Sequence, residues 1–245
     1  MPGTRNAGLL ALGGIALAAL LTMIGHVEVN ENLSPWSLTV SDFAVSDRGG
    51  VIDVAMVVLA LATAVLLRGL RRTGLPGPAV GIGGRLADLL LGTWVAGLML
   101  AAVVPTNEPG TPMTTAAYVH RYASVVAFLA LPVAGWLLAR RGDLARVARG
   151  LRGLALSSLV LAAVMVWSAY PGDRMLIGLI ERVLILTEVA LIAVVAGTVA
   201  WSRRPAEEAD HAVVVPDVRG EVSRTAHHNC MIDVNLGKVT PARGA

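Results

Sequence analysis

The feature that most constrains this chain is a series of long apolar runs, each close to the length that a helix needs to cross a bilayer. A run of roughly 20 apolar residues spans the hydrocarbon layer as an α-helix. Barrel strands would alternate in polarity, and these runs do not. With 55% hydrophobic and 15% charged residues, the composition excludes an ordinary soluble domain. The sequence therefore predicts an all-α, polytopic membrane protein.

Six candidate spans emerge, and short segments connect most of them. Short connections make consecutive helices antiparallel neighbours, so we expect an up-down bundle. The membrane domain covers residues 1–204, and the polar, irregular residues 205–245 are expected to form a flexible cytoplasmic tail. The predicted spans are residues 7–24, 51–67, 86–104, 118–139, 151–168 and 175–201.

The arginines predict the orientation of the bundle. Residues 68–85 carry four arginines and residues 140–152 carry five, whereas the opposite loops are rich in acidic residues. By the positive-inside rule, both termini are cytoplasmic and the loop 32–45 is extracytoplasmic, in a plasma-membrane protein. Residues 7–24 could also be a signal peptide. Their apolar length and the lack of an A-x-A cleavage pattern favour a retained helix.

Glu188 is the clearest intramembrane acid, because it lies near the middle of the last span. An ionised carboxylate at that depth costs at least a few kcal/mol, so Glu188 should face the bundle interior. It could serve a proton or cation relay, as in a proton-coupled carrier, or anchor a polar ligand. It could equally be a neutral acid that bonds to Thr187, Thr93 or a backbone carbonyl.

Other polar residues gather where spans meet the predicted outer face. His120 and Ser124 are one helical turn apart, with Arg121 beside them. A mouth with both signs of charge can bind a zwitterionic or phosphate-bearing group. The same charges could instead pair with each other and cap helix ends. The candidate ligand-binding residues are Asp42, His120, Arg121, Ser124, Glu181 and Arg182.

Known catalytic and metal-binding signatures are missing from the sequence. There is no GxSxG, no Walker GxxxxGK[ST], no HExxH and no CxxC. "GPAVGIGG" at 77–84 is best explained as a turn, and "HHNC" at 227–230, with the single cysteine, as part of the tail. We therefore expect no metal, no cofactor and no nucleic-acid partner, and an enzyme is the less favoured class.

Three segments together resemble a known family: "NLSPWSLTVSDFAV", "VVPTNEPGTPMTTAAYVHRYASVVAFLALPVAGWLLARR" and "GLIERVLILTEVALIAV". They are similar to the bacterial and archaeal integral-membrane family catalogued as domain of unknown function 998, over about residues 8–203. A more distant likeness is to the six-helix Frag/DRAM/Sfk-like membrane proteins. Where the family often has an aspartate, this chain has Asn107. The matching positions are Pro35, Ser41, Asp42, Pro105, Thr106, His120, Gly178 and Arg182.

The resemblance implies an architecture and a site location but no reaction. All matching positions fall on the predicted outer side, so the loop 32–45 is expected to fold back as a lid and bring Asp42 to His120 and Arg182. The main hypothesis is a pocket that binds a lipid headgroup or small polar molecule, in a sensor, scaffold or transporter. The alternatives are a lipid-modifying enzyme with His120 as general base, oriented by Asp42, and the carrier based on Glu188.

Overall fold

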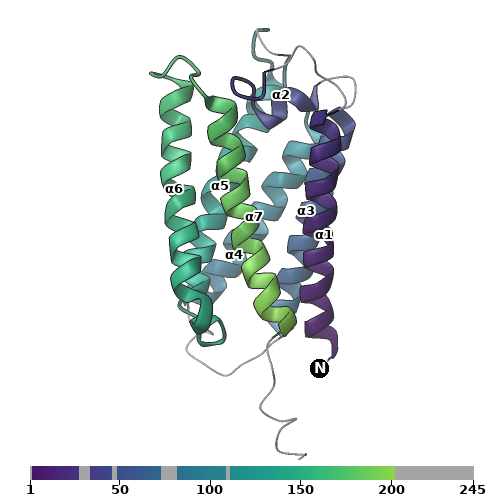
Figure 1. The fold of residues 1–245 in the computed structure, drawn as a ribbon, viewed down its shortest axis with the longest axis vertical. Coiled ribbons are helices and arrows are strands. Elements are labelled where there is room, and N and C mark those ends of the chain that lie inside the picture. Colours follow the sequence, from purple (N-terminus) through teal and green to yellow (C-terminus); the bar gives the residue numbers. More distant parts are fainter. Residues whose placement is uncertain (1, 28–33, 46–48, 73–81, 109–110, 202–245) are drawn as a thin grey trace, which may run out of the picture. The chain divides into compact units, whose positions relative to one another are not determined.

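The computed structural model describes residues 2–27, 34–45, 49–72, 82–108 and 111–201. Within these residues every regular element is helical, and six helices are long and apolar enough to cross a membrane, which confirms the predicted fold class (Figure 1). Two short elements are α2 (Val40–Ala44) and the 3-10 helix η2 (Gly142–Val147). The long helices are α1 (Pro2–Val27), α3 (Gly49–Arg72), α4 (Ile82–Val103), α5 (Thr115–Leu138), α6 (Ala148–Ala169) and α7 (Ile177–Trp201).

Most helices extend beyond the apolar spans that the sequence predicts, because polar residues at their ends continue the helix. In α3 the last turn carries Arg71 and Arg72, whose long side chains can reach the polar interface while their stems stay in the apolar layer. Pro105 ends its span as expected, since α4 stops at Val103. The glycine-rich segment 77–84 falls mostly outside the described residues, and the tail 205–245 with its "HHNC" lies wholly outside them.

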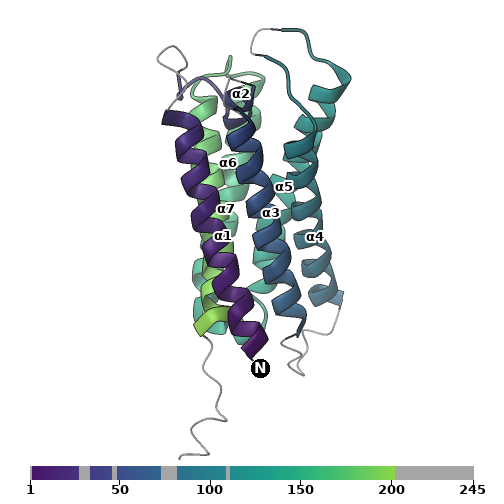
Figure 2. The ribbon, with the colours of Figure 1, turned by 90° about the vertical axis from the view of Figure 1, so that its right-hand side faces the viewer.

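The six long helices form a closed ring in which neighbours in sequence are neighbours in space. The contacts run from α1 to α3, α4, α5, α6 and α7 in turn, and α7 packs back against α1 (Figures 1 and 2). Up-down connection produces this order, because each short connection returns the chain beside the helix it has just left. The ring has two ends: α2 covers one, called here the α2 end, and α1 begins at the other, called the termini end (Figure 1).

Small residues bring the helices together toward the termini end. A Cβ on Gly8 of α1 would lie 2.6 Å from the backbone nitrogen of Ala200 in α7, and one on Gly69 of α3 would lie 2.7 Å from the Cβ of Ala7. In lipid the tails are as apolar as leucine, so helices associate through close packing of small residues. The hydrophobic core includes Leu131 and Leu138 of α5 and Leu151 of α6, all 0% exposed.

Candidate functional site

The short helix α2 forms because its first turn caps itself. Thr39 Oγ1 accepts the N–H of Asp42 at 3.2 Å, and Asp42 Oδ2 accepts the N–H of Thr39 at 2.8 Å. This reciprocal capping box satisfies two backbone donors that a helix start would otherwise leave without partners. Arg174, in the α6–α7 connection, donates from Nη2 to the same Asp42 oxygen at 3.3 Å. The carboxylate of Asp42 therefore shapes α2 and ties it to a neighbouring loop.

Arg182 and Gly178, one turn apart on α7, hold the residues that precede α2. Arg182 Nη1 donates to the carbonyl oxygens of Pro35 at 2.7 Å, Leu38 at 2.8 Å and Gly178 at 2.9 Å. Gly178 donates its N–H to the Trp36 carbonyl at 3.1 Å, and a Cβ on Gly178 would lie only 2.5 Å from the Pro35 oxygen. The loop thus folds back over the helix ends, as predicted, and the Gly-x-x-x-Arg pattern is its docking site.

The guanidinium of Arg182 contacts two rings: it bonds to the imidazole of His26 and lies over the phenyl ring of Phe43 in α2. His26 Nδ1 donates to the Thr22 carbonyl at 2.7 Å, so its Nε2 accepts from Arg182 Nη2 at 3.0 Å. The Phe43 ring stacks on His26 at 4.8 Å between centroids, and the Arg182 guanidinium lies 5.1 Å from its centre. Acceptors and an aromatic face offset the cost of an arginine near the apolar layer.

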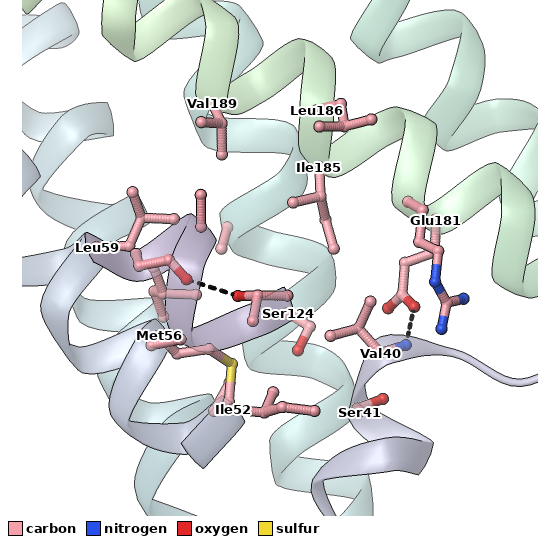
Figure 3. Close-up of a pocket in the computed structure, with 18 of the residues that line it drawn as sticks. Val40, Ser41, Ile52, Met56, Leu59, Ser124, Glu181, Ile185, Leu186 and Val189 are labelled. Carbon is pink, nitrogen blue, oxygen red and sulfur yellow. Dashed lines mark hydrogen bonds between the residues drawn. The ribbon is translucent and has the colours of Figure 1, made fainter. Parts of the chain in front are cut away.

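A cavity of about 410 Å³ lies under α2, between α1, α3, α4, α5 and α7. Most of its wall is apolar; Figure 3 shows Ile52, Met56 and Leu59 of α3 and Ile185 and Val189 of α7 along it. Polar groups are confined to the α2 end of the cavity. These polar lining residues are Thr22, His26, Ser41, His120, Ser124, Glu181 and Arg182.

Glu181 and His120 are the two titratable side chains that are almost enclosed at the polar end, each 5% exposed. Glu181 accepts a short hydrogen bond from the backbone N–H of Val40, the first residue of α2 (Figure 3). His120 Nδ1 donates to the Val104 carbonyl at 2.9 Å, which leaves Nε2 as the ring nitrogen that can meet a ligand. The lid and the end of α4 therefore position these two groups.

The structure brings four of the six predicted ligand-binding residues to the cavity: His120, Ser124, Glu181 and Arg182. Arg121 is exposed on α5, and the Asp42 carboxylate is bonded to Thr39 and Arg174, so neither belongs to the lining. The contacts of Asp42 and His120 lead to different partners. The structure thus gives no support to the expected orientation of His120 by Asp42, which the enzyme alternative requires.

Glu188 is 0% exposed near the middle of α7, and neither of its carboxyl oxygens has a hydrogen-bond partner among the described residues. The side chains expected to serve it are engaged elsewhere. Thr187 shares a 2.9 Å hydrogen bond with Ser158, and Thr93 donates to the Leu89 carbonyl of its own helix. Full burial also separates Glu188 from the cavity, which counts against a carrier that loads this acid from the polar mouth.

Sequence reasoning missed the cap of α2, although the signal was present. Thr39 and Asp42 have the Ser/Thr-x-x-acid spacing that marks a helix start, whereas the prediction for Asp42 was a place in the ligand-binding cluster beside His120 and Arg182. It also missed Thr22 and Trp94 as lining residues. Their positions depend on how far the helices stand apart, which no local pattern encodes.

Asn107 organises the α4–α5 connection. Its Nδ2 donates to Thr111 Oγ1 and to the Pro112 carbonyl, and its Oδ1 accepts from the N–H and hydroxyl of Thr114. An aspartate could not donate the first two bonds. Within the described residues no three His, Cys, Asp or Glu side chains converge as metal ligands.

Comparison with known families matches residues 12–198 to the family described as "Protein of unknown function (DUF998)". No curated protein and no solved structure matches the chain. The more distant likeness to Frag/DRAM/Sfk-like proteins stays a prediction.

Proposed function

The chain belongs to the DUF998 family of proteins of unknown function, and we propose that this multi-pass membrane protein binds a lipid headgroup or a small polar molecule in the cavity under α2. One observation carries the proposal: a mostly apolar cavity of about 410 Å³ under α2 has a small set of polar lining residues, among them Ser41 of α2 itself and Glu181, which bonds to α2. Small-molecule sites are mostly apolar cavities of roughly 300–1,000 Å³ with a few placed polar groups.

The contacts favour binding over catalysis. The guanidinium of Arg182 holds the lid, since it donates to the carbonyl oxygens of Pro35 and Leu38. It also donates to the Gly178 carbonyl of its own helix and to His26. Nδ1 of His120 donates to a backbone carbonyl and not to a carboxylate, and Asp53 of α3 lies within electrostatic range of the ring without a hydrogen bond to it among those described. A docked lid over a polar cavity suits a sensor, a scaffold or a transporter.

We further propose that the α2 end faces the extracytoplasmic side of the plasma membrane and that both termini are cytoplasmic. Support comes from the arginines of the last turn of α3 and the first turns of α6, which lie at the termini end. By the positive-inside rule, the arginine-rich end of a bundle stays in the cytoplasm. The lid and the polar mouth would then meet ligands from outside or from the outer leaflet.

Native mass spectrometry of the purified full-length protein tests the binding proposal. Ile185 projects into the cavity, so Ile185→Trp should fill it, whereas Val183→Trp places the same ring on an exposed part of the same helix. We expect a co-purifying lipid or small molecule on the wild type and on Val183→Trp, and at least a tenfold lower occupancy on Ile185→Trp. Equal occupancy on both variants, with both folded by thermal unfolding, would exclude this cavity as the site.

A further inference from the structure

Two hydroxyl groups on the cavity wall have already used their only proton. Thr22 Oγ1 donates to the Ala18 carbonyl of its own helix at 2.9 Å, and Ser124 Oγ donates to the His120 carbonyl at 3.0 Å. A hydroxyl has one proton and two lone pairs. Toward the cavity, both oxygens can therefore only accept hydrogen bonds.

The titratable groups at the polar end are acceptors as well. Because Nδ1 of His120 carries the proton that binds the Val104 carbonyl, Nε2 of the neutral ring offers a lone pair. Glu181 presents carboxyl oxygens, of which one accepts from Val40. Arg182 is the exception: its two terminal nitrogens donate to three carbonyls and His26, and its Nε–H is a donor beyond those four bonds. Thr22, Ser124, His120 and Glu181 thus each present a hydrogen-bond acceptor to the cavity. A ligand that satisfies these acceptors has to carry hydrogen-bond donors.

Charged side chains near the polar end already have charged or titratable neighbours without a ligand. Arg174 pairs with Asp42 at 3.3 Å, Arg182 lies within electrostatic range of Glu181 and Asp42, and Asp53 of α3 lies within electrostatic range of His120. An anionic head group would bring further lone pairs to these four acceptors. A quaternary cation would bring charge but no donors. A group with hydroxyls and no charge supplies donors to these acceptors and adds no further charge to the existing pairs.

The rest of the cavity fits one apolar chain that arrives from the membrane. From Glu181 to Val189 the lining follows α7 for roughly 12 Å at a 1.5 Å rise, close to the thickness of one leaflet, about 15 Å. Met23 of α1 and Leu186 of α7 line the cavity yet are 62% and 66% exposed. The cavity therefore opens sideways between α1 and α7, whereas Gly8 and Ala200 close these helices at the termini end.

We infer that the cavity binds an uncharged amphiphile with a single apolar chain and a hydroxylated head group, which reaches it through the opening between α1 and α7. This inference rests on the proposed function and names its ligand class. Each hydroxyl of the head group donates one hydrogen bond, to Thr22 or to one of Ser124, His120 and Glu181, and the chain lies along Ile185 and Val189.

The ligand class can be tested by measuring how tightly a set of matched probes binds to the full-length protein in detergent. The probes share one alkyl chain and differ in the head: a monoalkylglycerol, the same glycerol with both hydroxyls methylated, a carboxylate and a trimethylammonium, with free glycerol as the chainless control. We expect the monoalkylglycerol to bind at least tenfold more tightly than any of the others. A carboxylate, ammonium or methylated probe that binds as tightly overturns the ligand class but leaves the proposed function standing.

Thr22→Val removes one acceptor without changing the shape of the side chain. It should weaken the monoalkylglycerol about fivefold, the effect of one hydrogen bond, and leave the methylated probe unchanged. Thr93→Val is the matched control, because Thr93 makes the same bond to its own helix outside the cavity. Equal losses for both probes contradict the inference. If no probe binds and Ile185→Trp changes no co-purifying ligand, the proposed function itself fails.

Discussion

The two ends of the bundle are built from the same helices but packed in opposite ways. Toward the termini end, glycine and alanine let α1 touch α7 backbone to backbone. Toward the α2 end the same two helices stand apart, and a polar lid and a cavity occupy the space. Because lipid tails provide no hydrophobic force between helices, the positions of small residues decide where helices close and where they leave room.

Two glutamates on one face of α7 repeat this contrast at the level of a single residue type. Glu181, at the α2 end, accepts from the first residue of α2, whereas Glu188, seven residues further, is enclosed without a partner. Helical periodicity puts both on the same face. The lid and the cavity, which reach Glu181 and not Glu188, make them different.

The largest expected effect is at the junction of the lid with α7. Gly178→Ala places a Cβ against the Pro35 carbonyl, so the loop has to move and its bonds to Arg182 are lost. We expect a loss of about 3 kcal/mol in the free energy of unfolding in detergent, from overpacking and broken hydrogen bonds. Gly50→Ala at the same end, where a Cβ meets nothing within 4 Å, is the control and should be neutral. Equal stability of both variants would show that the lid does not depend on this glycine.

The close contact between α1 and α7 at the termini end can also be tested by a glycine-to-alanine substitution. Gly8→Ala directs a Cβ at the backbone of Ala200 and should push α1 from α7, at a cost of about 2 kcal/mol. Gly13→Ala, on the same helix with nothing within 4 Å, should be neutral or slightly stabilising through helix propensity. Thermal unfolding in detergent measures both. Similar midpoints would mean that small residues do not set this helix contact.

Replacing each of the two glutamates by leucine should change the free energy of unfolding in opposite directions. Glu188→Leu replaces a carboxyl without partners by an apolar group and should raise the free energy of unfolding by about 1–2 kcal/mol. Glu181→Leu removes the acceptor of the Val40 N–H and should lower it by about 1 kcal/mol. Chemical unfolding of the two variants in parallel checks the signs. A destabilised Glu188→Leu would indicate that this acid has a partner in the membrane.

The smallest effect concerns the cap of α2. Thr39→Ala removes the side chain that accepts the N–H of Asp42 and should cost about 1 kcal/mol. Ser37→Ala, at an exposed position just before the helix, is the control. Proteolysis of the lid, which reports local opening, should be faster for Thr39→Ala alone. If both variants are cleaved at the wild-type rate, the capping box does not hold the lid.

Sequence alone determined the six helices, because a segment in lipid has to satisfy its own backbone hydrogen bonds and long apolar runs do so only as helices. It also placed His120, Ser124, Glu181 and Arg182 near one end, since they flank the same ends of apolar runs. The partners of these side chains depend on contacts between residues more than a hundred positions apart. Only the tertiary structure could show that Arg182 bonds to the carbonyls of Pro35 and Leu38, and that Glu188 has no bond among the described residues.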